Sequence, residues 1–339
     1  MQFDYFIGVD VSKDTLDFAL VKANQVLFHQ QVTNDKKGIA DFLKQLRQQT
    51  KVPISQCLFC MEHTGIYNNP LLKALHELSA SIWVERAVQI KESLGMVRGK
   101  TDKVDAQRIG LYAYKNREEV RLWTPPRPVM AQLDRLTAQR ARLVKVIKLL
   151  QTPLTASEGF IDKADRKAEK QACAASLKAL KADLKTANAA ITTLIEDDPQ
   201  LKHLFERVTS VVGISQITAA EIVLSTNEFK TITDPKKFAC YAGVAPFERS
   251  SGQFKGRPKV SHLANKKVKS LLHLGAMSAI QHCAQLKDYY QPVRRCGKVK
   301  EGKNKMLVLN NVRNKLVLRI FACVREDRNY DEKYTTALV

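Results

Sequence analysis

The first third of the chain alternates short apolar runs with polar turns. Three runs rich in β-branched and aromatic residues lie close together, which predicts a meander of three strands. Asn34 and Asp35 then precede an amphipathic stretch that is typical of a helix ending near residue 49. Two more strands follow with a helix between them, and this order of elements predicts a mixed α/β sheet. The predicted strands cover residues 3–10, 15–21, 25–32, 56–62 and 81–84, and the second helix covers residues 69–78.

The middle of the chain is predicted to be helical. The prolines between Pro125 and Pro128 end the first domain, because proline cannot continue a helix. Apolar residues then recur at helical spacing over residues 129–150, and a second long pattern rich in Ala, Lys and Leu covers residues 165–195. Two long helices in succession indicate an antiparallel hairpin or coiled coil, which serves either as a packing layer or as a dimerisation arm.

The last part of the chain is predicted to be mainly helical. A helix, a tight turn at Gly213 and a second helix follow one another, and the free N–H groups of such a turn can hold a phosphate. Residues 247–262 are too polar for a core element and are interpreted as a loop. A helix follows over residues 266–282, and a closing helix ends near residue 324. The residues expected on the inner face of the first of these two helices are Leu271, Leu272, Leu274 and Met277.

Charge is unevenly distributed along the chain, whose formal net charge is +21. The patterns above divide it into domains of residues 1–125, 126–200 and 201–339. The first domain holds 17 Lys and Arg against 14 Asp and Glu, whereas the last holds 25 against 11. A strongly basic domain favours a polyanionic partner, bound with steep salt dependence. The charge does not distinguish RNA from DNA, and a basic protein with no such partner is the alternative.

Cysteine usage and hydropathy favour a soluble, intracellular protein. The seven cysteines are scattered and odd in number, which fits reduced thiols in a cytoplasm. Cys57 and Cys60 have CxxC spacing but lie in a strand-like run with no second CxxC, so zinc ligation is not expected. No apolar run reaches the roughly 18 residues that a membrane span requires, and no membrane partner is expected.

Four carboxylates are the candidate catalytic residues. Asp10 and Glu62 each close an apolar run that predicts a buried strand, whereas Asp102 and Asp105 lie three residues apart where a helix begins. Alone, each could be a turn residue or an acid that complements a helix dipole. Together they can converge at the strand ends, where divalent cations would offset their repulsion. Mg²⁺ or Mn²⁺ held there could act on a phosphodiester, so the sequence predicts a metal-dependent nuclease or strand-transfer centre.

The order of these acids resembles that of the DEDD transposases of insertion sequences. The shared features are the Gly-Val-Asp strand ending at Asp10, the strand ending at Glu62, and the string Lys-Thr-Asp-Lys-Val-Asp-Ala at residues 100–106. This family includes recombinases guided by a bridge RNA, and the pilin-inverting DNA invertases are its relatives. The resemblance covers essentially the whole chain. It implies a RuvC-like (RNase H-like) α/β domain, a coiled-coil segment, and a mainly α C-terminal transposase domain.

The resemblance also implies a nucleophilic serine. In the family this serine precedes a glycine, shortly after a Gly-x-x-Pro segment; here Gly243 to Pro246 leads to Ser250 and Ser251, followed by Gly252. Ser251 is therefore the match, with Ser250 as the alternative. The family's Pro-Gly-Ile-Gly turn reads Val-Gly-Ile-Ser here, which weakens the case for a phosphate grip. The residues expected to contact nucleic acid are Lys100, Gly213, Arg249, Lys255, Arg257 and Lys259.

The resemblance implies a DNA recombinase that acts on donor and target DNA with a structured guide RNA. It implies a site composed of residues from two protomers, in a bacterial cytoplasm and associated with the nucleoid. The coiled-coil segment favours a homo-oligomer, dimer to tetramer, and recombination of two duplexes favours four subunits. Two other functions remain open. A RuvC-like junction endonuclease would use the acids but attack with water rather than Ser251. A non-catalytic nucleic-acid-binding protein would need neither.

Overall fold

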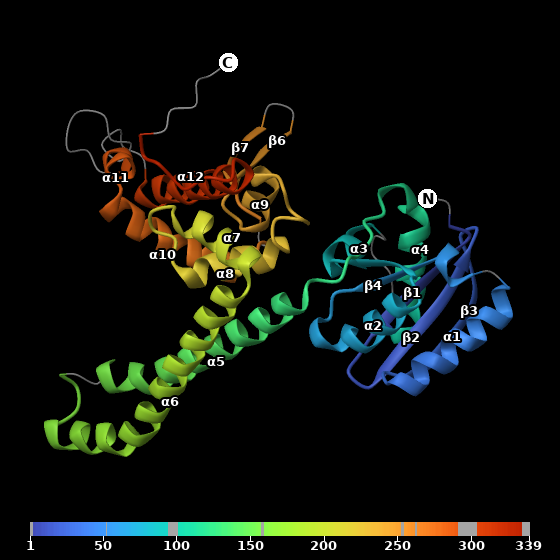
Figure 1. The fold of residues 1–339 in the computed structure, drawn as a ribbon, viewed down its shortest axis with the longest axis horizontal. Helices are drawn as coiled ribbons and strands as arrows, with labels where there is room; N and C mark the ends of the chain where they lie inside the picture. The colour runs from blue at the N-terminus through green and yellow to red at the C-terminus, as the bar shows by residue number, and fades with distance from the viewer. Residues whose placement is uncertain are drawn as a thin grey trace. The chain divides into compact units, whose positions relative to one another are not determined.

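The computed structural model describes residues 3–51, 53–93, 101–156, 159–251, 254–261, 263–290 and 304–333. The chain divides into two compact units, Met1–Pro125 and Pro126–Val339 (Figure 1). The first boundary of the predicted three-domain division coincides with the division between these units. The second boundary, at residue 200, remains a prediction.

The N-terminal unit is built on a mixed five-stranded sheet in the order β3-β2-β1-β4-β5. The first three strands form the predicted antiparallel meander, and β4 and β5 add to β1 in parallel. All five predicted strands are confirmed within two residues at each end. The strands are β1 (Tyr5–Val11), β2 (Thr15–Lys22), β3 (Gln25–Thr33), β4 (Cys57–Glu62) and β5 (Ser81–Glu85).

Helices cover both faces of this sheet (Figure 1). Because side chains alternate along a strand, Ile7 and Val9 of β1 pack with helices α1 and α2, whereas Phe6 packs with α4 on the other face. Asp35 caps α1 by accepting a hydrogen bond from the Gly38 amide at 2.8 Å, as the sequence predicts. The helices are α1 (Lys36–Thr50), η1 (Ile54–Gln56), η2 (Gly65–Asn68), α2 (Asn69–Glu77), α3 (Ala87–Ser93), α4 (Asp102–Lys115) and η3 (Arg117–Glu119).

The C-terminal unit is mainly helical, with one two-stranded hairpin. The two long predicted helices are confirmed as α5 and α6, which pack along each other and extend away from the other helices of the unit (Figure 1). Their role as a coiled coil remains a prediction. The elements are α5 (Pro128–Ala156), α6 (Lys163–Asp197), α7 (Pro199–Thr209), α8 (Gln216–Thr226), α9 (Pro235–Tyr241), β6 (Phe247–Ser251), β7 (Phe254–Lys259), α10 (Lys266–His282), α11 (Ala284–Tyr290) and α12 (Lys305–Arg325).

An ionic network around the buried Glu228 fixes the start of the C-terminal unit. Arg127, directly after the proline-rich boundary, donates to Asp198 at 2.7 Å and to Glu228 at 3.0 Å. Lys230 also donates to Glu228 at 2.9 Å. These bonds satisfy the buried Glu228 carboxylate and join the start of α5 to the α6–α7 junction and to the segment after α8.

Two predictions for the C-terminal unit are wrong. Residues 247–262 are not simply a loop, because β6 and β7 pair antiparallel, with Ser251 opposite Phe254. Backbone pairing needs no apolar pattern, so a polar hairpin gave no hydrophobic signal. On α10, Leu272 is buried, but Leu274 and Met277 are 64% and 39% exposed, because Gly275, Ala276 and Ala279 occupy the inner face.

None of the helices within the described residues is long and apolar enough to cross a membrane.

Candidate active site

A close backbone contact between β1 and α4 positions the candidate site. A Cβ placed on Gly8 would lie 2.1 Å from the carbonyl oxygen of Ala106 and 2.1 Å from the amide nitrogen of Gly110. Only glycine therefore allows α4 to lie directly on this strand. The contact aligns the two elements, so the end of β1 meets the beginning of α4.

The four predicted acids come from three elements that meet at this end. Asp10 lies near the end of β1, and Glu62 closes the parallel neighbour β4, where Val9 pairs with Met61. Asp102 and Asp105 lie in the first turn of α4, as the sequence predicts. Burial, then the negative charges of Asp102, Asp105 and Glu62, raise the pKa of Asp10 to about 6.

Local interactions hold the acids of α4 in place. Thr101 caps the helix by accepting a hydrogen bond from the Val104 amide at 3.3 Å. Arg108, one turn further along, donates to Asp105 at 2.8 Å. The helix N-terminus and this guanidinium offset part of the negative charge at Asp105.

A buried acid that the sequence did not single out adjoins the site. Asp17 of β2 pairs directly with Asp10 across the antiparallel strands and is 3% exposed. Its carboxylate is hydrogen-bonded to His29 Nε2 at 2.7 Å and to Gln31 Nε2 at 2.9 Å. Its charge adds to the rise in the pKa of Asp10. The hairpin turn at residues 12–14 could have revealed this pairing, because it places residues 10 and 17 opposite each other.

The donor set suits a hard divalent cation. Carboxylate oxygens are the ligands that Mg²⁺ and Mn²⁺ prefer, and such an ion would offset the negative charges that raise the pKa of Asp10. In the described part of the chain, no three His, Cys, Asp or Glu side chains are already close enough together to hold a metal. The acids are therefore neighbours that would have to draw together around a cation.

Ser251 lies in the C-terminal unit, as the last residue of β6. The hairpin that carries it begins directly after Pro246, and Val244 just before it accepts a hydrogen bond from Asn310 of α12 at 2.7 Å. The backbone of the hairpin is described, but the side chains of Ser250, Ser251 and most of their neighbours are not. Gly252, which follows Ser251, lies outside the described residues.

The predicted nucleic-acid contacts have different outcomes. Lys100 lies outside the described residues, and for Arg249, Lys255 and Arg257 only the backbone of the hairpin is described. Lys259, at the end of β7, is exposed.

Gly213 forms the predicted turn between α7 and α8, with φ of +94°. A Cβ there would lie 2.4 Å from the carbonyl oxygen of Gly275 on α10. Helix packing therefore already requires this glycine, whether or not a phosphate binds to the turn.

A buried cation near the serine hairpin is a further residue that the sequence did not single out. Arg313 of α12 is 5% exposed and donates to His273 Nδ1 at 2.7 Å and to Asn310 at 3.3 Å. Its Nε has no hydrogen-bond partner among the described residues. Burial, then the Arg313 charge, lowers the pKa of His273, which favours the neutral ring. Arg313 is one of several basic residues of α12, and nothing in the sequence distinguishes it from the exposed ones.

Two family models match parts of this chain. A family model described as a transposase, of the DEDD type of IS110, matches residues 7–156. A second model, described as the transposase IS116/IS110/IS902 family, matches residues 205–291. The two matches span the acids of the N-terminal unit and the serine hairpin, respectively.

Individual relatives extend the match over the chain. The pilin gene-inverting proteins of Moraxella bovis and Moraxella lacunata are each 23% identical over 332 residues, covering 97% of this chain and 98% of theirs. An uncharacterised 44.8 kDa protein of insertion element IS116 from Streptomyces clavuligerus is 25% identical over 101 residues, or 28% of this chain and 25% of that protein.

Among solved structures, Thermus thermophilus RuvC in complex with a Holliday junction substrate is 11% identical, with a TM-score of 0.27, covering 34% of this chain and 98% of that one. On the family models and the relatives, this chain belongs to the IS110-type DEDD transposases, a family of DNA-recombining enzymes.

Proposed function

We propose that this protein is a recombinase that cuts and rejoins DNA, using the four acids of the N-terminal unit and Ser251 of the C-terminal unit. The observation that carries the proposal is that the ends of β1 and β4 and the first turn of α4 bring Asp102, Asp105 and Glu62 close to Asp10, where burial and then their charges raise its pKa. Acids that only capped a helix or closed a turn would not need to lie close to acids of two other elements. Their family order supports the same reading.

The four acids would hold Mg²⁺ or Mn²⁺. When bound, such an ion supplies positive charge that polarises a phosphate and lowers the pKa of a hydroxyl group. The chain itself contributes the aligned β1 and α4 backbones, and Arg108 holds the Asp105 carboxylate in one orientation. Asp17, fixed by His29 and Gln31, places a further carboxyl group beside Asp10 on the side that faces β2.

Ser251 is proposed as the nucleophile. Its Oγ forms a bond to a DNA phosphorus atom, the bond between that phosphorus and one chain oxygen breaks, and the hydroxyl proton passes to the departing oxygen. The resulting diester links Ser251 to the DNA end, so one phosphate ester bond has formed for the one that was broken. The reverse reaction with a new DNA end can therefore rejoin the strand without an external energy source.

Trapping the covalent intermediate tests this proposal. The full-length protein, supplied with its native flanking DNA and Mg²⁺, should yield a protein–DNA adduct that survives a denaturing gel. Ser251→Ala and Asp102→Asn should both abolish the adduct, whereas Ser250→Ala serves as the matched control and should retain it. Cut DNA with no adduct would refute the serine and favour the endonuclease that attacks with water.

A structured RNA is proposed as a second nucleic-acid partner. The support is the family resemblance together with the basic residues 201–339, whose 25 Lys and Arg against 11 Asp and Glu suit a polyanion of either kind. RNA co-purifying with the protein, and loss of adduct formation after ribonuclease treatment, would support the proposal. Full adduct formation by ribonuclease-treated protein would refute it.

Light scattering on the same samples measures the proposed dimer or tetramer.

A further inference from the structure

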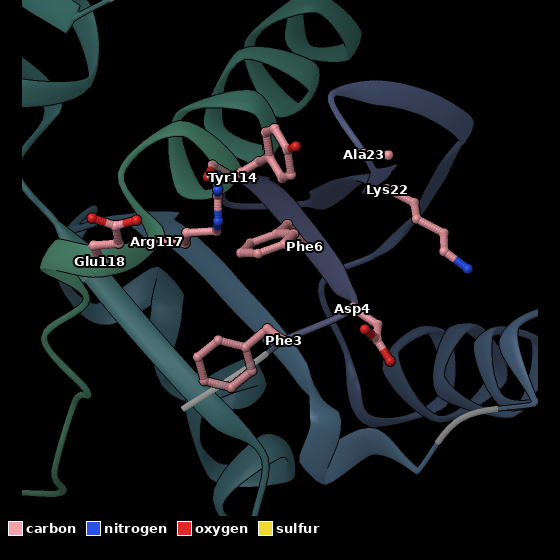
Figure 2. A pocket seen from close by; sticks show the side chains of 8 residues that line it. All are labelled: Phe3, Asp4, Phe6, Lys22, Ala23, Tyr114, Arg117 and Glu118. Atoms are coloured by element: carbon pink, nitrogen blue, oxygen red, sulfur yellow. Dashed lines mark hydrogen bonds between the residues drawn. The ribbon is translucent and has the colours of Figure 1, made fainter.

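A pocket lies at the opposite end of the β1–α4 pair from the acids. Figure 2 shows three aromatic side chains grouped between Arg117 and Glu118 on one side and Asp4 and Lys22 on the other. Its volume is about 570 Å³, within the roughly 300–1,000 Å³ typical of ligand pockets. The lining residues are Phe3, Asp4, Phe6, Lys22, Ala23, Tyr114, Arg117 and Glu118.

The aromatic residues form a fixed surface. Phe6 is buried, and its ring meets Tyr114 edge to face at 5.4 Å and Phe3 at 6.4 Å between centroids. Phe3 and Tyr114 are only partly buried, so part of each side chain is accessible from the pocket. Packing against Phe6 restrains both rings, which lowers the entropic cost of stacking a planar ligand on them.

The charged residues of the pocket are balanced in sign. Arg117 is held by a hydrogen bond to the Tyr114 carbonyl oxygen at 3.0 Å and lies 4.8 Å from the centre of the Tyr114 ring. Lys22 donates to Tyr5 at 3.2 Å on the other side. Asp4 and Glu118 contribute two carboxylates. The two carboxylates would repel a ligand whose only polar group was a phosphate. The pocket therefore suits a ligand that has hydrogen-bond donors as well as an anionic group.

We propose that this pocket binds one unpaired nucleotide of a single-stranded nucleic acid. A base presents a flat π-face to Phe3 and Tyr114, its amino group can donate to Asp4 or Glu118, and its phosphate can accept from Arg117 or Lys22. A base in a duplex is stacked between its neighbours, so its face is not free to contact Phe3 or Tyr114. The binding step stands by itself; only the identity of the strand rests on the proposed function.

The position of the pocket would allow it to place a bound strand relative to the acids. Phe6 and Asp10 lie on the same face of β1, because they are separated by four residues. Four residues of strand span about 13 Å, and the Gly8–Gly110 contact fixes α4 on β1 between the pocket and the acids. A nucleotide held in the pocket would therefore lie at a fixed distance from the acids, and its strand would reach them by passing around α4.

Hydrogen exchange measured by mass spectrometry tests the pocket without any reaction. The full-length protein, in EDTA, is titrated with an eight-nucleotide DNA strand, the same sequence as RNA, the matching blunt duplex, and a mononucleotide. The single strands should slow exchange in peptides covering residues 3–6 and 111–120, whereas the duplex should not. The DNA and RNA arms identify the source of the strand, and protection by the mononucleotide alone would identify a free nucleotide as the ligand and overturn the strand assignment.

Paired substitutions separate the pocket from the basic C-terminal unit. Phe3→Leu with Arg117→Gln should raise the strand concentration needed for protection of these peptides at least fivefold, the low end of the effect of losing one stacked base. Lys115→Gln, an exposed neighbour outside the pocket, is the matched control. Protection confined to residues 201–339, or protection of residues 3–6 that survives the double substitution, would overturn the proposal. Because no cleavage is measured, failure here leaves the adduct experiment unaffected.

Discussion

Replacing Asp10 with asparagine should make the metal-free protein more stable while abolishing its activity. The pKa of Asp10 is raised from 3.8 to about 6 by burial and by Asp102, Asp105 and Glu62. A folded-state pKa above the unfolded value means that the folded chain binds the proton more tightly. Asp10 therefore favours the folded state below pH 4, and that advantage is lost as the pH rises from about 4 through 6.

The size of this effect follows from the shift. The difference between 3.8 and about 6 corresponds to about 3 kcal/mol at about 1.36 kcal/mol per pH unit. Asp10 is only partly buried, so solvent screening reduces the expected penalty to about 1–2 kcal/mol above pH 7. Asp10→Asn removes the ionised carboxylate, so its free energy of unfolding should exceed that of the wild type by this amount at pH 8 in EDTA. At pH 4 the two should be nearly equal.

Tryptophan fluorescence during urea unfolding measures this difference in the intact chain. The only two tryptophans, Trp83 and Trp123, both lie in the N-terminal unit, so their emission reports on the unit that contains the acids. Asp41→Asn, an exposed acid on α1, is the control and should change little at either pH. Millimolar Mg²⁺ should stabilise the wild type and not Asp10→Asn. If Asp10→Asn were less stable than the wild type at pH 8 in EDTA, the acids would not repel one another and the reasoning would fail.

Three further substitutions test how the fold holds its sites. Gly8→Ala should destabilise the N-terminal unit by about 3 kcal/mol in the same unfolding assay, because its Cβ would lie 2.1 Å from α4 backbone atoms; a stable, active variant would contradict the close contact. Asp17→Asn should cost about 1–3 kcal/mol, because the bonded pair with His29 is lost in a buried site; an unchanged urea midpoint would show that the pair contributes nothing. Gly213→Ala should lower the helical circular-dichroism melting temperature of the C-terminal unit; a weakened affinity for DNA with unchanged melting would instead indicate a phosphate grip.

The sheet and its acids could be predicted because their signals are local. Each strand of the N-terminal unit carries its own apolar run, and the acids stand at the ends of those runs or at a capped helix start. The contact that joins β1 to α4 could not be predicted from the sequence. The Gly8–Gly110 approach depends on two residues about a hundred positions apart, and glycine in either place alone reads as a flexible position.

The errors in the C-terminal unit have a related cause. Leu274 and Met277 have helical spacing with Leu271, but smaller residues take the inner face of α10 because α8 and the Gly213 turn approach too closely for large side chains. The hairpin that carries Ser251 is held by backbone pairing between polar residues. Hydrophobic periodicity detects neither situation, because one depends on a neighbour's distance and the other on groups that every residue has.

The side chains on one face of β1 set the distance between the pocket and the acids. Phe6, Gly8 and Asp10 occupy successive positions on one face of a single strand, and each meets a different part of α4: Tyr114 near its end, Gly110 in its middle, and the acids of its first turn. Because Gly8 and Gly110 leave no space between the two backbones, the strand and the helix cannot slide past each other without a clash. The distance between an aromatic pocket and an acidic site on such a pair is therefore set by covalent geometry and not by loop conformation. A single strand bound at both the pocket and the acids would therefore span a fixed distance. Insertions in the surrounding loops would leave that distance unchanged.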